Sequence, residues 1–175
     1  MLILNINGPI NAGKTTVSRI LEKLLPDSLF IEVDNLLSED EAKQLGLSMD
    51  EAFCESVDRL ERLILKEKEE KRHSVVFFAY PIGREYYDRW KGYEDEHTRF
   101  FNVTLSPSEE ECLRRGGDDM SVWEHDRILQ MYEEGCHNPG FSDLIIHNDN
   151  QTPEETARVV LDFLEKIKTE FNDLF

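Results

Sequence analysis

Short apolar runs alternate with amphipathic stretches along the chain. Five of these runs have strand length and lie at residues 2–6, 29–33, 75–79, 100–105 and 144–146. The run "VVFFA" is β-branched and aromatic enough to be buried on both faces of a sheet. Between the runs, apolar residues recur at helical spacing, as Val17, Leu21 and Leu24 do. This alternation predicts an α/β fold with a five-stranded parallel sheet and helices on both faces.

Helix starts can be recognised from capping residues. Ser48 is followed three positions later by Glu51, ahead of a stretch with helical apolar spacing. Ser106 and Thr152 each precede a proline and have a glutamate three positions on, so helices are predicted to begin there too. No repeat, low-complexity tract or linker interrupts the pattern, and residues 1–175 are therefore predicted to form a single domain.

Charge narrows the possible partners. The 37 acidic residues outnumber the 20 basic ones, and a net charge of −17 opposes binding to nucleic acid. The apolar runs are too short to span a membrane, and the N-terminus lacks the pattern of a secretory signal. Three cysteines without a Cys-x-x-Cys pair are typical of reduced thiols. We therefore expect a soluble, cytoplasmic protein without nucleic-acid or membrane partners.

A phosphate-binding motif follows the first predicted strand. Residues 8–15, "GPINAGKT", match G-x-x-x-x-G-K-[ST] and open a predicted helix, as the motif requires. The glycines allow backbone N–H groups to surround an anion, and the helix N-terminus adds its positive dipole. Lys14 would neutralise the β- and γ-phosphates of ATP, while the Thr15 hydroxyl would ligate Mg²⁺. The predicted nucleotide-binding residues here are Gly8, Asn11, Ala12, Gly13, Lys14, Thr15 and Thr16.

The sequence does not favour a switch-type GTPase. No aspartate precedes a glycine by three positions, as that class requires. After the last predicted strand the chain reads "HNDN" at residues 147–150, in place of a guanine-reading Asn-Lys-x-Asp. ATP is therefore the expected nucleotide.

Two carboxylates end the second predicted strand. Strand ends at the carboxyl edge of such a sheet face the ligand crevice, and residues two apart share one side of a strand. Glu32 and Asp34 are therefore both candidates for the metal site, and Asp34 is the candidate catalytic base and acceptor contact. The alternative is that one caps the next helix while the other is solvated.

Basic residues and glycines suggest a lid at about residues 114–127. Arg114 and Arg115 precede two glycines, a composition that suits a segment closing over a nucleotide and bringing positive charge to the transferred phosphate. Arg127, on a predicted helix at residues 123–132, is expected to face the same region. Alternatively, one of the two adjacent arginines pairs with the glutamates one helical turn earlier.

On these features the chain resembles the small P-loop kinases of the shikimate kinase-like group, which includes adenylylsulfate kinases, chloramphenicol phosphotransferase and zeta-toxin-like kinases. The resemblance covers nearly the whole chain and rests on residues 8–16, residues 32–35, "VTLSPSEEECLRR" and "NDNQTPEETA". It implies a P-loop nucleoside triphosphate hydrolase fold, ATP held by Lys14 and Thr15, and phosphates clamped by Arg114 or Arg115. It also implies that the loop after the last strand borders adenine, which falls on Asn150, Gln151, Thr152 and Pro153.

Aromatic residues cluster after the third predicted strand. Tyr80 and Arg84 lie close to the carboxyl edge of the sheet, together with four further tyrosine and tryptophan residues up to position 93. Such a cluster suits a ring-bearing or anionic acceptor, and Tyr80 and Arg84 are the predicted contacts. Packing of an aromatic helix against the sheet is an equally good explanation. The histidines show no metal-ligand spacing, so no zinc site is expected.

The features together predict an ATP- and Mg²⁺-dependent kinase that transfers the γ-phosphate to a hydroxyl of a small molecule. Lys14, Asp34, Arg114 and Arg115 are its predicted catalytic residues. Two alternatives stay open: a nucleoside or nucleotide kinase, and a non-catalytic ATP-binding regulatory module. The chain is expected to act as a monomer or homodimer.

Overall fold

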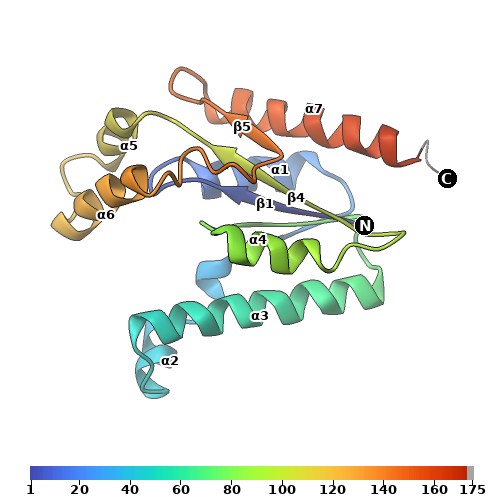
Figure 1. Ribbon diagram of the computed structural model, residues 1–175, viewed down its shortest axis with the longest axis horizontal. Coiled ribbons are helices and arrows are strands. Elements are labelled where there is room, and N and C mark those ends of the chain that lie inside the picture. The colour runs from blue at the N-terminus through green and yellow to red at the C-terminus, as the bar shows by residue number, and fades with distance from the viewer. Residues whose placement is uncertain (173–175) are drawn as a thin grey trace.

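The computed structural model describes residues 1–172, and the side chains of residues 1–170. Five strands form one parallel sheet in the order β2-β3-β1-β4-β5, which confirms the predicted fold class (Figure 1). The strands are β1 (Leu2–Asn7), β2 (Ser28–Ile31), β3 (Val75–Ala79), β4 (Arg99–Leu105) and β5 (Leu144–Ile146). The helices are α1 (Lys14–Leu24), the 3₁₀ turn η1 (Val33–Asn35), α2 (Glu39–Gln44), α3 (Met49–Glu70), α4 (Arg84–Lys91), α5 (Glu109–Gly116), α6 (Val122–Glu133) and α7 (Pro153–Asn172).

The central strand β1 divides the sheet. The chain builds β2 and β3 on one side of β1, and then β4 and β5 on the other. Because all strands are parallel, their carboxyl ends share one edge, on the left in Figure 1, where the start of α3 and the helices α5 and α6 also lie. Such a reversal of strand order marks the place where α/β sheets bind ligands.

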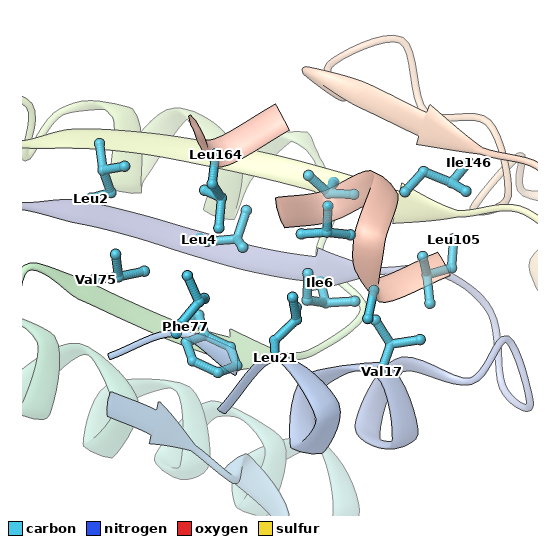
Figure 2. Packing of buried hydrophobic residues seen from close by; sticks show 14 of the residues in the cluster. Leu2, Leu4, Ile6, Val17, Leu21, Val75, Phe77, Leu105, Ile146 and Leu164 are labelled. Atoms are coloured by element: carbon cyan, nitrogen blue, oxygen red, sulfur yellow. The ribbon is translucent and has the colours of Figure 1, made fainter. Parts of the chain in front are cut away.

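Both faces of the sheet are covered by helices, as predicted. Under α1 and α7 lies an apolar cluster (Figure 2) that includes Leu2, Leu4, Ile6, Val17, Leu21, Val75, Phe77, Leu105, Ile146 and Leu164. The opposite face packs on α3 and α4 through a second cluster that includes Ile3, Val57, Leu60, Ile64, Val76, Phe78, Trp90 and Phe100. Alternate residues of β1 therefore point to different sides of the sheet: Leu2, Leu4 and Ile6 enter the first cluster and Ile3 the second, while Asn5 and Asn7 are buried polar residues near the end of the strand.

Two of the three predicted helix starts are confirmed. Ser48 forms a capping box with Glu51 at the start of α3, and Thr152 accepts a hydrogen bond from the Glu155 amide at the start of α7 (3.1 Å). The third prediction is wrong by two residues. Ser106 is buried at the end of β4, and Ser108 instead caps α5.

The second strand is shorter than predicted. β2 ends at Ile31, and the chain then turns through η1, whereas the apolar pattern extends the strand to residue 33. The short polar helix α2 that follows was not predicted, because it buries none of its residues. Among residues 1–172, no helix is both long and apolar enough to cross a bilayer.

Candidate active site

The loop between β1 and α1 wraps around the helix N-terminus. Gly8 and Gly13 adopt φ values of +139° and +93°, and Asn11 between them has φ +61°. A Cβ on Gly8 would lie only 2.4 Å from the Leu105 carbonyl oxygen, so glycine is required where the loop passes β4. Within residues 1–172 no side chain caps α1, and its first turn contains no acidic residue. The positive end of this helix is therefore open to an anion.

Lys14 extends along the same loop. Its ammonium group donates a hydrogen bond to the Pro9 carbonyl oxygen at 2.6 Å. Burial lowers the pKa of Lys14 to about 8, and the negative charge of Asp34 is among the effects that partly oppose this shift. A bound polyphosphate would raise the pKa of Lys14 and stabilise its charged form.

Arg115 joins three segments of the chain around the loop. Its guanidinium donates to the carbonyl oxygens of Ala12 (3.1 Å) and Asn148 (2.7 Å), and to the Glu111 carboxylate (2.7 Å). Arg114 also binds Glu111, at 2.6 Å through two nitrogen atoms, but its side chain is 70% exposed against 22% for Arg115. The two bound arginines lower the pKa of Glu111 to about 2. Of the pair, Arg115 is therefore the one that lies against the phosphate loop.

Two cavities meet at Gly13, Thr16 and Arg115. The first, called the loop cavity here, has a volume of about 330 Å³ and is lined by Asn11, Gly13, Lys14, Thr15, Thr16 and Arg115. The second, the α7 cavity, has a volume of about 350 Å³ and is lined by Gly13, Thr16, Val17, Glu111, Arg114, Arg115, Asn148, Asp149, Gln151, Pro153 and Thr156. Their cationic groups lie beside the phosphate loop, and each cavity has a volume within the range of small-ligand sites.

Glu32 and Asp34 both follow the end of β2, at and within the 3₁₀ turn η1. Glu32 precedes η1, and its carboxylate accepts hydrogen bonds from Arg19 (2.7 Å) and Asn35 (2.6 Å). Asp34 is exposed, and its charge acts on both Lys14 and Tyr80. The prediction that Glu32 and Asp34 point to the same side assumed a strand, and the strand ends before Glu32. The prediction therefore does not apply. The structure brings Asp34 to the neighbourhood of Lys14 and holds Glu32 against α1.

Tyr80 directly follows β3, and a buried polar residue of β1 fixes its backbone. The Asn5 side chain donates to the Tyr80 carbonyl oxygen (3.0 Å) and accepts from the Tyr80 amide (3.2 Å). Asn5 also donates to Asn102 of β4 at 2.8 Å, and both asparagines are fully buried. The Tyr80 ring lines a third cavity of about 610 Å³ beside α2 and the start of α3, called the α3 groove here.

Most of the aromatic cluster has a structural role instead. Arg84 stacks on Tyr87 and Phe141, at 5.7 and 5.5 Å from the ring centres, and lies 3.5 Å from Asp88. Trp90 is buried in the core. The alternative of aromatic packing therefore describes this segment, and Tyr80 is its member at the α3 groove.

Three other predicted residues lie apart from these cavities. Arg127 pairs with Glu134 of the same segment at 3.1 Å. Thr152 caps α7, and Asn150 is exposed beside it. From the predicted adenine-bordering loop, the structure brings Gln151 and Pro153 to the α7 cavity.

Asn148 lies at the site and was not predicted from the sequence. Asn148 is buried, donates to the Ala12 carbonyl oxygen at 3.1 Å, and has no hydrogen-bond partner for its side-chain oxygen among the described residues. It lies two residues after the end of β5, so its place at the carboxyl edge was a usable signal. Glu111 was anticipated by the alternative that an arginine pairs with the glutamates one helical turn earlier, and in the structure both Arg114 and Arg115 bind it.

Comparison with known proteins identifies the fold. No family model and no curated protein matches the sequence. Among solved structures, a shikimate kinase from Aquifex aeolicus is 24% identical with a TM-score of 0.53, over 97% of this chain and 99% of that chain. A tunicamycin resistance protein from Deinococcus radiodurans is 20% identical with a TM-score of 0.65, over 93% and 94% of the two chains. A gluconokinase from Sinorhizobium meliloti is 18% identical with a TM-score of 0.65, over 98% and 95%.

These similarities extend over nearly the full length of each chain. Together with the parallel sheet and the glycine-rich loop after β1, they show that this chain has the P-loop nucleoside triphosphate hydrolase fold.

Proposed function

We propose that the chain is an ATP- and Mg²⁺-dependent phosphotransferase that moves the γ-phosphate to a hydroxyl group of a small molecule. One observation carries the proposal: Lys14 and Arg115 line one cavity at an uncapped helix N-terminus, and an exposed carboxylate, Asp34, lies within electrostatic reach of Lys14. Positive charge for a triphosphate and a base for an acceptor hydroxyl are the parts that phosphoryl transfer requires.

The loop cavity fits the phosphates of a nucleotide. The Asn11 side-chain nitrogen is buried there without a hydrogen-bond partner among the described residues, so it is free to donate to a phosphate oxygen. The α7 cavity next to it would take the base and ribose, between the Arg114 and Arg115 side and the Gln151 and Pro153 side. The nucleotide would thus span both cavities, which share Gly13, Thr16 and Arg115.

Thr15 is the protein group proposed to hold Mg²⁺. Its side chain is exposed in the loop cavity, and Mg²⁺ is commonly held by one or two protein groups together with substrate phosphates. When bound, the ion would neutralise phosphate charge and orient the transferred group. Glu32 has no place in this proposal, because Arg19 and Asn35 hold its carboxylate.

The chain's own residues then divide the work of transfer. Lys14 and Arg115 neutralise the triphosphate and hold it in line, and Asp34 accepts the proton that the acceptor hydroxyl releases. Arg114 lines the α7 cavity and is free to turn inward, because its exposed side chain is held by Glu111 alone among the described residues. Catalysis in this proposal rests on positioning and charge rather than on a covalent enzyme intermediate.

The proposal is tested by asking whether ATP consumption depends on an acceptor. Release of ADP is measured with a panel of sugars, hydroxylated ring acids, nucleosides, and aminoglycoside and phenicol antibiotics. We expect acceptor-dependent turnover that Asp34→Asn removes without loss of ATP binding. Asp40→Asn is the matched control, an exposed carboxylate six positions along the chain. ATP binding without turnover against every acceptor would instead favour a regulatory module.

A further inference from the structure

The α3 groove is larger than either nucleotide-side cavity and has a different chemical character. Its volume is about 610 Å³, and its lining consists of Leu37, Ser38, Glu39, Ala42, Lys43, Leu47, Ser48, Met49, Ala52, Phe53, Ser56 and Tyr80. Apolar side chains and a few hydroxyl groups thus dominate it. Small-molecule sites commonly combine an apolar lining with a small number of polar groups in this way.

Two large apolar side chains of α3 line this groove and are exposed to solvent. Met49 is 75% exposed and Phe53 is 37% exposed, although both belong to the start of a helix that packs on the sheet elsewhere. The Phe53 ring stacks on the Tyr80 ring, with their centres 5.2 Å apart. The two stacked rings thus both line the groove, where an aromatic or alicyclic ring would pack against them.

The groove offers no unpaired cation. Among its described lining residues the charged ones are Glu39 and Lys43, and these lie 3.6 Å apart as a pair. Arg59, on the same helix as Phe53, is held by Glu41, Glu55 and the Leu36 carbonyl oxygen. The lining therefore carries no net charge, and an acceptor with a carboxylate or phosphate would compete with Glu39 for Lys43, in a protein whose net charge is −17.

The segment that carries Asp34 adjoins the groove, because Val33, the residue before Asp34 in η1, packs in the same apolar cluster as Tyr80 of the groove. Tyr80 lines it, and burial followed by the charge of Asp34 raises the pKa of the Tyr80 hydroxyl, which therefore stays protonated and able to donate a hydrogen bond. The same Asp34 carboxylate acts on Lys14. A ring bound on Phe53 and Tyr80 would thus have its substituents close to the proposed base.

We propose that the acceptor is an uncharged aromatic or alicyclic alcohol, bound with its ring on Phe53 and Tyr80 and its hydroxyl directed toward Asp34. This inference rests on the proposed phosphotransferase function, because only a phosphotransferase would use the groove as an acceptor site. It narrows the acceptor to a chemical class and places anionic acceptors, such as hydroxy acids and nucleotides, outside it.

A binding experiment tests the groove without relying on turnover. Phenylethanol and phenylacetate have similar size and an identical ring, but only the second is charged. Each is titrated into the full chain, and amide chemical shifts are followed by NMR. We expect phenylethanol to shift the amides of Ala52, Phe53 and Tyr80 with a dissociation constant on the order of 10 mM, as befits so small a ligand. Phenylacetate should bind at least about tenfold more weakly.

Variants on α3 supply the controls. Phe53→Ala should weaken phenylethanol binding at least fivefold, whereas Leu63→Ala should leave it unchanged, because both side chains are 37% exposed but Leu63 lies outside the groove. Met49→Lys adds a cation and should bring phenylacetate to at least the affinity of phenylethanol. The dispersion of each variant's spectrum reports whether it has folded.

The possible results separate this inference from the function it rests on. Equal or tighter binding of phenylacetate to the unmodified chain would overturn it, as would the absence of shifts at Ala52, Phe53 and Tyr80 with either probe. Failure of ATP binding or turnover would instead count against the proposed function, because the titration involves neither. Acceptor-dependent turnover with a hydroxy acid as the best substrate would refute the inference and retain the phosphotransferase.

Discussion

Arg115→Ala removes the side chain that connects α5, the phosphate loop and the segment after β5. Its hydrogen bonds to Ala12, Asn148 and Glu111 all disappear in this variant. The Ala12 carbonyl still accepts from the Asn148 side chain, and Glu111 still binds Arg114, so part of the network survives. With hydrogen bonds of charged groups at about 1.5–3 kcal/mol each, and allowance for these remaining partners, the free energy of unfolding should fall by about 2–3 kcal/mol.

The assay combines urea unfolding with calorimetric titration of Mg-ATP. For a chain of this length the loss of stability corresponds to a fall of about 5–10 °C in melting temperature. ATP affinity should also fall, by about tenfold or more, because a cation leaves the loop cavity. Arg115→Lys should recover part of the affinity but little of the stability, since an ammonium cannot reproduce the guanidinium fork.

Arg114→Ala is the matched control on the neighbouring residue. Its side chain is 70% exposed and binds Glu111 alone among the described residues, so no measurable loss of stability is expected. Equal effects of the two substitutions, or an Arg115→Ala protein with the stability and ATP affinity of the original chain, would refute the reasoning from these contacts.

Further predictions concern pH, backbone and the buried polar residues. Because burial lowers the pKa of Lys14 to about 8 from its usual 10.5, its charge costs stability below pH 8 and this cost fades between pH 8 and 10.5. ATP binding should accordingly take up a proton at pH 9 and weaken as pH rises from 8, which calorimetry in two buffers of different ionisation enthalpy checks; binding without proton uptake would contradict it. Gly8→Ala should abolish ATP binding or folding, since φ is +139° and the Leu105 carbonyl lies 2.4 Å from the added Cβ, and an active, stable variant would argue against this loop geometry. Asn5→Leu should lower the free energy of unfolding by about 2–4 kcal/mol in urea, because the Tyr80 backbone loses buried partners; a change below about 0.5 kcal/mol would contradict that role. Glu32→Gln should change turnover by no more than about twofold. Complete loss of turnover in this variant would show that Glu32 takes part in the reaction.

Much of the fold was predictable because its signals are local. Each strand contains a short apolar run, and helices cover both faces of the sheet, so the pattern alone located all five. The caps at Ser48 and Thr152 and the glycine-rich loop depend on neighbouring residues in the same way. Ser106 failed because Ser108 offers a second cap two residues later, and the end of β4 extends far enough to bury the first.

The site was less predictable, because its residues meet through tertiary contacts. Strand periodicity placed Glu32 beside Asp34, and the 3₁₀ turn η1 separates them instead. Composition could not distinguish Arg114 from Arg115, since which of them faces the loop depends on the orientation of α5. Arg127 carried the right charge for a lid, but Glu134 on the same segment is its partner.

The affinity of Lys14→Met for Mg-ATP at pH 7 is the most direct test of triphosphate binding at the β1–α1 loop. The substitution keeps the length of the side chain and removes its charge from the loop cavity. Titration calorimetry should show binding at least about tenfold weaker than in the original chain, while urea unfolding shows a folded protein. Unchanged affinity in a folded Lys14→Met protein would contradict the claim that this loop holds the nucleotide.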